Sequence, residues 1–176
     1  MTRIVIAPRI ETERLILREI MAEDYGPVHA LWTDPENVRF VGGKPSTPSQ
    51  SWRRITNSAG MWPVLNYGYW ALEEQSSGKF IGLVGFADFR RDEPVGFSGD
   101  PEIGYVIDKT VHGKGYGREA MNACMQWMDD THGRIRTICM IEPGNIASLK
   151  IAERLGYTTY SEGEIDGATV LLMERV

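Results

Sequence analysis

A glycine-rich stretch just before an expected helix is the clearest place where this sequence could do chemistry. In residues 112–118 (HGKGYGR), Gly113, Gly115 and Gly117 alternate with other residues. Glycines have no Cβ, so an anion can approach the backbone N–H groups, and the positive end of the helix dipole attracts it. A pyrophosphate is the ligand that such an arrangement favours. A flexible loop leading into an ordinary helix is the competing interpretation.

Two common phosphate loops fit this stretch less well. A Walker A loop needs a lysine followed by serine or threonine after its last glycine, and none is present here. The Rossmann pattern is closer, because Gly115, Gly117 and Ala120 fit GxGxxA and Glu142 could bind a ribose. In a Rossmann unit, however, the glycines follow the strand directly, whereas residues 109–112 intervene here. A dinucleotide-binding protein is therefore the less favoured alternative.

Several motifs resemble those of one enzyme family. Residues 102–107 (EIGYVI) and 112–120 (HGKGYGREA) resemble motif A of the GNAT N-acetyltransferases, in the form typical of the branch with the ribosomal-protein N-terminal acetyltransferases. Residues 143–148 (PGNIAS) and 154–157 (RLGY) resemble motif B, and residues 10–19 (IETERLILRE) are similar to the opening of that branch. The resemblance covers essentially the whole chain in order. It implies an acetyl-CoA-dependent N-acetyltransferase that uses no metal.

The resemblance also implies which residues bind acetyl-CoA. The strand that carries Val106 and Ile107 opens from its neighbour in this family, and its freed backbone groups bind pantetheine like an added strand. Arg118 and Lys150 are candidates for the CoA phosphates, and Asn145 for the pantetheine chain, although Asn145 also suits a helix N-cap. The full predicted set is Val106, Ile107, His112, Gly113, Lys114, Gly115, Tyr116, Gly117, Arg118, Asn145 and Lys150.

Two residues are candidates for catalysis. In this family an amine attacks the thioester directly, a tetrahedral oxyanion forms and the CoA thiolate leaves. Glu102 resembles the general base of the branch, with a solvated strand-end charge or a role for Asp100 as alternatives. Many relatives have a tyrosine at the position of Ala152 that protonates the thiolate. Because the tyrosine is missing here, Ser148 is a candidate hydrogen-bond donor to sulfur, with solvent as the donor and a plain helix-surface serine as the alternatives.

The elements that must position these residues follow from hydrophobic periodicity. We expect one α/β domain over residues 1–176 with the three-layer GNAT-like fold, in which a mixed, mostly antiparallel sheet of six to seven strands packs with about four helices. The expected strands are residues 14–19, 69–74, 79–89, 102–108, 136–141, 157–162 and 168–175. The expected helices are residues 24–32, about 49–61, 116–131 and 147–155.

The composition restricts the class of protein. The net charge of −5 argues against a nucleic-acid partner, and the chain has no apolar run long enough to span a membrane. Cys124 and Cys139 lack CxxC spacing, so we expect no disulfide and a reducing, cytoplasmic setting. The three histidines form no zinc motif.

The acceptor amine is not defined by these motifs. A protein N-terminus and a small amine are both consistent with them, and the terminal strands could support a homodimer. Acidic residues in one loop slightly favour a cationic amine; they are Asp88, Asp92, Glu93 and Asp100. Trp32 and Trp62 flank the helical region that walls the acceptor side in the family. Because Ala152 replaces the usual tyrosine, a non-catalytic acyl-CoA sensor is the second hypothesis.

Overall fold

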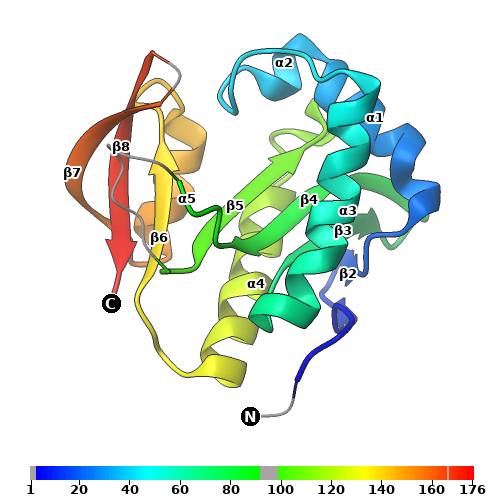
Figure 1. Cartoon of the computed structure of the whole chain (residues 1–176), viewed down its shortest axis with the longest axis horizontal. Helices are drawn as coiled ribbons and strands as arrows, with labels where there is room; N and C mark the ends of the chain where they lie inside the picture. The colour runs from blue at the N-terminus through cyan, green and yellow to red at the C-terminus, as the bar shows by residue number, and fades with distance from the viewer. Residues whose placement is uncertain (1–2, 92–98, 166) are drawn as a thin grey trace.

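Runs of branched and aromatic residues form the strands, which assemble into one sheet with the order β1-β2-β3-β4-β5-β6-β8-β7 (Figure 1). The structure is a computed structural model that describes residues 3–91, 99–165 and 167–176. The strands are β1 (Ile10–Glu11), β2 (Leu15–Arg18), β3 (Tyr69–Glu74), β4 (Lys79–Ala87), β5 (Glu102–Ile107), β6 (Thr137–Ile141), β7 (Thr158–Ile165) and β8 (Ala168–Arg175). The α-helices are α1 (Tyr25–Thr33), α2 (Pro35–Val38), α3 (Pro48–Leu65), α4 (Tyr116–His132) and α5 (Ile146–Arg154).

The mixed, mostly antiparallel sheet that the sequence predicts is confirmed. Within the described residues only β5 and β6 pair in parallel, and all other neighbours are antiparallel. The sheet has eight strands instead of six or seven, because β1 is too short to show an alternating pattern. The four-residue α2 likewise lies in a segment that its prolines and glycines led us to predict as a loop.

Helix α3 is longer than predicted. We expected it to end before the Trp62-Pro63 pair, but it continues to Leu65 with Pro63 inside its last turn. Proline removes one helical hydrogen bond without preventing this turn, because the buried Trp62 ring packs against Trp70 at a centroid distance of 4.5 Å. The helix ends at Asn66, whose left-handed backbone places its N–H 3.0 Å from the Trp62 carbonyl.

Apolar residues on the two faces of the sheet create two layers of core. Along β5, Val106 packs with α1 and α3 on one face, whereas Ile107 packs with α4 on the other. This follows from the two-residue period of a strand. Five apolar positions at helical spacing predicted the buried face of α4; Ala120, Cys124 and Met128 are fully buried against this side of the sheet, and Ala123 and Trp127 are partly buried there. The sheet is thus sandwiched between helices, as the three-layer expectation requires.

The sheet opens between its two central strands. All six residues of β5 pair with β4, but β5 and β6 share a single pair, Glu102 with Ile138. Beyond that pair the strands separate, as Figure 1 shows for β5 (green) and β6 (yellow). The β5 edge that faces β6 therefore keeps backbone groups that no strand uses.

Two predicted segments fall partly outside the described residues. They are most of the loop at residues 90–101 and Asp166 of the turn before β8. None of the described helices combines the length and the apolar character that crossing a bilayer requires.

Candidate functional site

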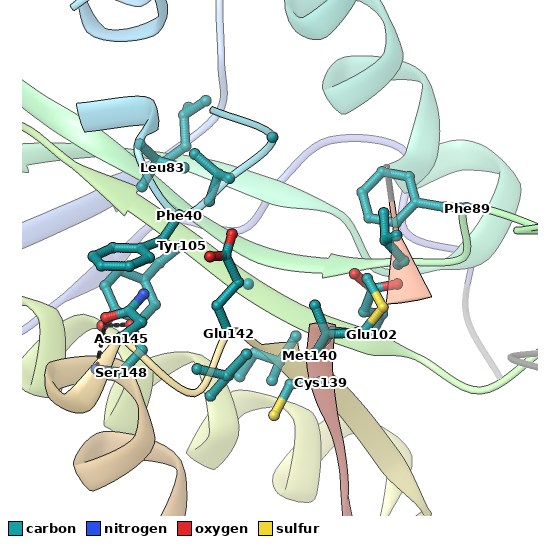
Figure 2. Close-up of a pocket in the computed structure, with 18 of the residues that line it drawn as sticks. Phe40, Leu83, Phe89, Glu102, Tyr105, Cys139, Met140, Glu142, Asn145 and Ser148 are labelled. Carbon is teal, nitrogen blue, oxygen red and sulfur yellow. Dashed lines mark hydrogen bonds between the residues drawn. The ribbon is translucent and has the colours of Figure 1, made fainter. Parts of the chain in front are cut away.

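A cleft of about 630 Å³ lies where β5 and β6 separate (Figure 2). Its walls come from the strands β3–β8, the helices α1, α3, α4 and α5, and the segment that follows α2. Of the predicted site residues, the cleft brings together Glu102, Val106, Asn145 and Ser148. The glycine-rich loop, Ile107 and Lys150 do not line it. The predicted residues therefore divide between this cleft and the start of α4.

The start of α4 has the backbone geometry that the glycine pattern predicts. Gly113 and Gly115 have φ angles of +77° and +84°, in the left-handed region that a side chain with a Cβ adopts only under strain. Gly115 is the N-cap of α4, and no side chain caps this end. The first N–H groups of a 17-residue helix are thus left without a side-chain acceptor, which suits an anion.

Gly117 differs from the other two glycines of the loop, although the sequence predicted that all three let an anion approach the backbone. A Cβ at this position would lie 3.4–3.6 Å from the side chains of Tyr105, Ile151 and Ile107, so it points toward the protein interior. Its φ angle is not in the left-handed region. A Cβ on Gly117 would thus make ordinary contacts with β5 and α5, whereas Gly113 and Gly115 are the two glycines whose backbone conformation disfavours a Cβ.

Two loop side chains hold the loop in place. The His112 imidazole donates from Nε2 to the Ile107 carbonyl at 2.8 Å. The buried Tyr116 hydroxyl donates to Glu74 at 2.6 Å. Both side chains are thus engaged by the protein itself, although His112 remains an exposed residue, and the prediction that the two residues bind CoA stays a prediction. By contrast, the side chains of Lys114, Arg118 and Lys150 form no ion pair within the described ranges, and all three residues are exposed.

The N-terminal segment clasps this loop. Arg14 donates to the Lys114 carbonyl at 2.8 Å, and its guanidinium lies over the Tyr116 ring. Glu119 accepts hydrogen bonds from the Thr12 hydroxyl at 2.6 Å and from the Arg14 backbone at 2.8 Å. The motifs TERL and GREA contained these residues, but the sequence could not indicate that they contact each other.

Two hydroxyl groups meet at the start of α5, one from Ser148 and one from Tyr105 of β5. Asn145 caps the helix by accepting a hydrogen bond from the Ser148 N–H at 3.2 Å. The Ser148 hydroxyl lies 2.9 Å from the Tyr105 hydroxyl of β5, and Figure 2 shows the three side chains together. Burial raises the pKa of Tyr105, so its phenol stays protonated near neutral pH. A tyrosine hydroxyl is thus present at the site although Ala152 replaces the usual one.

Glu102 is buried in an ion pair. It is only 9% exposed, and its two carboxylate oxygens accept from Arg91 at 2.8 and 2.9 Å. The alternative of a solvated strand-end charge is therefore wrong. Asp100, the alternative base, pairs with Arg136 and does not line the cleft. A second carboxylate, that of Glu142, points into the cleft in Figure 2 and forms no ion pair within the described residues.

The acidic loop gives less support to a cationic acceptor than the sequence suggested. Asp88 and Asp100 each form an ion pair with an arginine, and neither lines the cleft. Asp92 and Glu93 lie outside the described residues.

The predicted tryptophans and cysteines lie in different surroundings. Trp32 lines the cleft, whereas Trp62 belongs to the core and donates to the Tyr69 carbonyl. Cys124 and Cys139 are free and buried, and burial raises the pKa of Cys139 to about 12.

Among residues 3–91, 99–165 and 167–176, no three His, Cys, Asp or Glu side chains gather as a metal site would require. The mostly antiparallel sheet is also incompatible with a Rossmann domain.

Comparison with known proteins identifies a family. The family model described as "Acetyltransferase (GNAT) domain" matches residues 14–158. A solved protein of Bordetella pertussis assigned to the GNAT family is 32% identical with a TM-score of 0.86, over 97% of this chain and 100% of the other. The uncharacterized protein YkkB of Bacillus subtilis is 26% identical over 84% of each chain. RimL, a ribosomal L7/L12 α-N-protein acetyltransferase solved with coenzyme A, shares the fold with a TM-score of 0.78 at 16% identity, over 96% and 98%.

Proposed function

Because this chain belongs to the GNAT acetyltransferase family, we propose that it transfers the acetyl group of acetyl-CoA directly to a primary amine in a ternary complex. The observation that carries the proposal is the cleft between β5 and β6, which opens beyond a single shared residue pair. A strand edge with unused backbone groups can bind an extended pantetheine chain as an added strand would bind.

The CoA half of the site extends from the cleft to the start of α4. The pyrophosphate binds the uncapped N–H groups next to Gly113 and Gly115, where the helix dipole is positive. Lys114, Arg118 and Lys150 supply cations for the phosphates. Val106 and Ile107 contribute backbone groups to the pantetheine. The coenzyme A complex of RimL, a protein of the same fold, supports this part of the proposal.

The transfer step needs a proton acceptor and a donor for sulfur. The amine nitrogen forms a bond to the thioester carbon, the carbon–sulfur bond breaks, and the nitrogen loses a proton. We assign that proton to Glu102, because the Arg91 pair leaves each carboxylate oxygen a second lone pair and burial limits competition from water. The departing sulfur receives a hydrogen bond from the Ser148 and Tyr105 hydroxyl pair. Glu142 is the competing base.

The Tyr105 hydroxyl weakens the sensor hypothesis. That hypothesis rested on the missing tyrosine at Ala152, and the structure holds another tyrosine hydroxyl 2.9 Å from Ser148. The experiment that separates the two functions is incubation with acetyl-CoA and amines while free thiol is followed. Amine-dependent thiol release identifies a transferase, whereas CoA binding without release identifies a sensor. The acceptor remains a protein N-terminus or a small amine, and the homodimer stays a prediction.

A further inference from the structure

A guanidinium on the α3 wall of the cleft pairs with no carboxylate of the described residues. Arg54 lines the cleft, and its Nε donates a long hydrogen bond of 3.4 Å to the Ser46 hydroxyl. Its guanidinium lies 3.4 Å from the centre of the Trp32 ring. No carboxylate of the described residues forms an ion pair with Arg54, whereas Arg91 on the same cleft is paired with Glu102.

This arrangement is costly unless something else compensates the charge. Burial lowers the pKa of Arg54, and among the described residues only Tyr69, not a carboxylate, acts against that effect. Arginine nevertheless stays charged in proteins, so the cleft keeps a partly desolvated cation. The Trp32 ring fixes the plane of the guanidinium, and the hydrogen bond to Ser46 uses only its Nε. The two terminal nitrogens can therefore form the parallel pair of hydrogen bonds that a carboxylate accepts.

A second donor lies in the same part of the cleft. Tyr69 lines the cleft, and its hydroxyl has no hydrogen-bond partner in the described part of the chain. A Cβ on Gly104 would lie 2.6 Å from it, so this hydroxyl is next to β5. Burial is the main cause that raises the pKa of Tyr69, and Arg54 and Glu102 both act on it. Tyr69 is thus a neutral donor within electrostatic range of both charged groups.

We propose that Arg54 binds a carboxylate of the acceptor, so that the acceptor is a small amino acid-like compound with an amine and a carboxylate. The inference rests on the proposed function of this cleft and names its substrate class. The cleft offers Arg54 and Tyr69 as donors to an anion, and Glu102 and Glu142 as acceptors for an amine. A polyamine would leave Arg54 facing a second cation.

The test compares matched acceptors in matched variants. The twenty standard amino acids are assayed with acetyl-CoA, and each that is acetylated is compared with its amide and its decarboxylated amine. Arg54→Gln should lower kcat/KM for the amino acid by about tenfold to a hundredfold, mainly through KM, because a charge-assisted hydrogen bond is lost. The same variant should change kcat/KM for the amide and the amine by less than about twofold.

Three controls keep this result interpretable. Arg53→Gln, an exposed neighbour on α3, should leave all three acceptors unchanged. Arg54→Lys should recover part of the loss, because lysine keeps the charge but not the paired geometry. Calorimetry with CoA should give the wild-type affinity for every variant, which shows that each one folds.

Several outcomes would overturn the inference. One is an equal loss for all three acceptors in Arg54→Gln. Another is a wild-type preference for the decarboxylated amine, for a polyamine or for a peptide N-terminus over every amino acid. In these cases acetyl transfer itself still stands, since thiol is released. If no amine of any class releases thiol, the proposed function fails together with this inference.

Discussion

At the scale of single residues, the site depends on side chains that pair with distant partners. Glu102 was identifiable from the EIGY motif, but its Arg91 partner and the Tyr105–Ser148 contact were not. These contacts join residues on different elements, and periodicity carries no information about which side chains meet across the sheet. The sequence therefore indicated the residue types of the site and missed the hydrogen bonds between its elements.

The first prediction separates the two carboxylates of the cleft. Glu102→Gln removes a proton acceptor and should lower kcat by about 10²–10⁴-fold with little change in CoA affinity. Glu142→Gln, the matched comparison on the same cleft, should lower kcat by less than about tenfold. Steady-state kinetics over a range of pH and calorimetry with CoA measure both effects. The reverse order of losses would transfer the role of base to Glu142.

The second prediction concerns the hydroxyl pair. The thiolate of a thiol with a pKa of about 8.5 is an acceptable leaving group, so Ser148→Ala should lower kcat by at most about tenfold. Tyr105→Phe should cost a similar amount, and the double variant should be no slower than the slower single variant, because the hydroxyls act as a unit. Independent, multiplicative losses would show that the two groups act separately. The kcat of Ala152→Tyr in the Ser148→Ala background tests whether a new phenol can rescue the loss.

At the scale of elements, strongly patterned segments were predicted well. The expected helix at residues 116–131 is α4, Tyr116–His132, and the expected strand at residues 102–108 is β5, Glu102–Ile107. The errors occurred where a local rule was overridden. Tertiary packing of Trp62 carried α3 past Pro63, and the two-residue β1 exists only because it pairs with β2. Neither effect is visible in a local window of sequence.

The third prediction distinguishes two glycines at the start of α4. Gly115→Val should lower CoA affinity by about tenfold or more, because valine is strained at a φ of +84° and the loop must change shape. Gly117→Val places its side chain among Tyr105, Ile151 and Ile107, so this variant should lower the melting temperature in addition to the CoA affinity. Calorimetry and thermal unfolding measure the two variants. Wild-type CoA affinity in Gly115→Val would refute the assignment of the pyrophosphate site.

The fourth prediction concerns the clasp between the N-terminal segment and α4. Burial acts to raise the pKa of Glu119, but hydrogen bonds from Thr12 and Arg14 outweigh it and leave the pKa below its ordinary 4.5. A depressed carboxyl pKa stabilises the fold above the unfolded pKa, and this stability is lost as pH falls through the folded pKa. The melting temperature of the wild type should therefore decrease as the pH is lowered below about 4.5. The decrease should be less steep in Glu119→Gln.

The control for this prediction is the exposed Glu153 on α5. Glu153→Gln should leave the pH dependence of the melting temperature unchanged, because this side chain forms no ion pair with the rest of the described chain. Parallel pH profiles for wild type and Glu119→Gln would show that the clasp does not stabilise the folded state.

At the scale of the whole molecule, the cleft is a consequence of sheet topology. A strand that pairs fully with β4 and at one residue with β6 must leave an opening, and Asn145, the N-cap of α5, lines it. The family resemblance predicted this opening, whereas composition and periodicity could not. Another wall of the cleft comes from α1 and α3, which contain none of the motifs that predicted the site, so Arg54 was not predicted.

The central claim is that this cleft joins an amine to the acetyl group of acetyl-CoA. The most direct measurement is mass spectrometry of the amines after incubation with the protein and acetyl-CoA, with free thiol quantified in the same sample. Direct acetyl transfer predicts one acetylated amine for each thiol released, with neither product formed when the amine is omitted. Tight CoA binding with no acetylated product from amino acids, peptides or polyamines would contradict it.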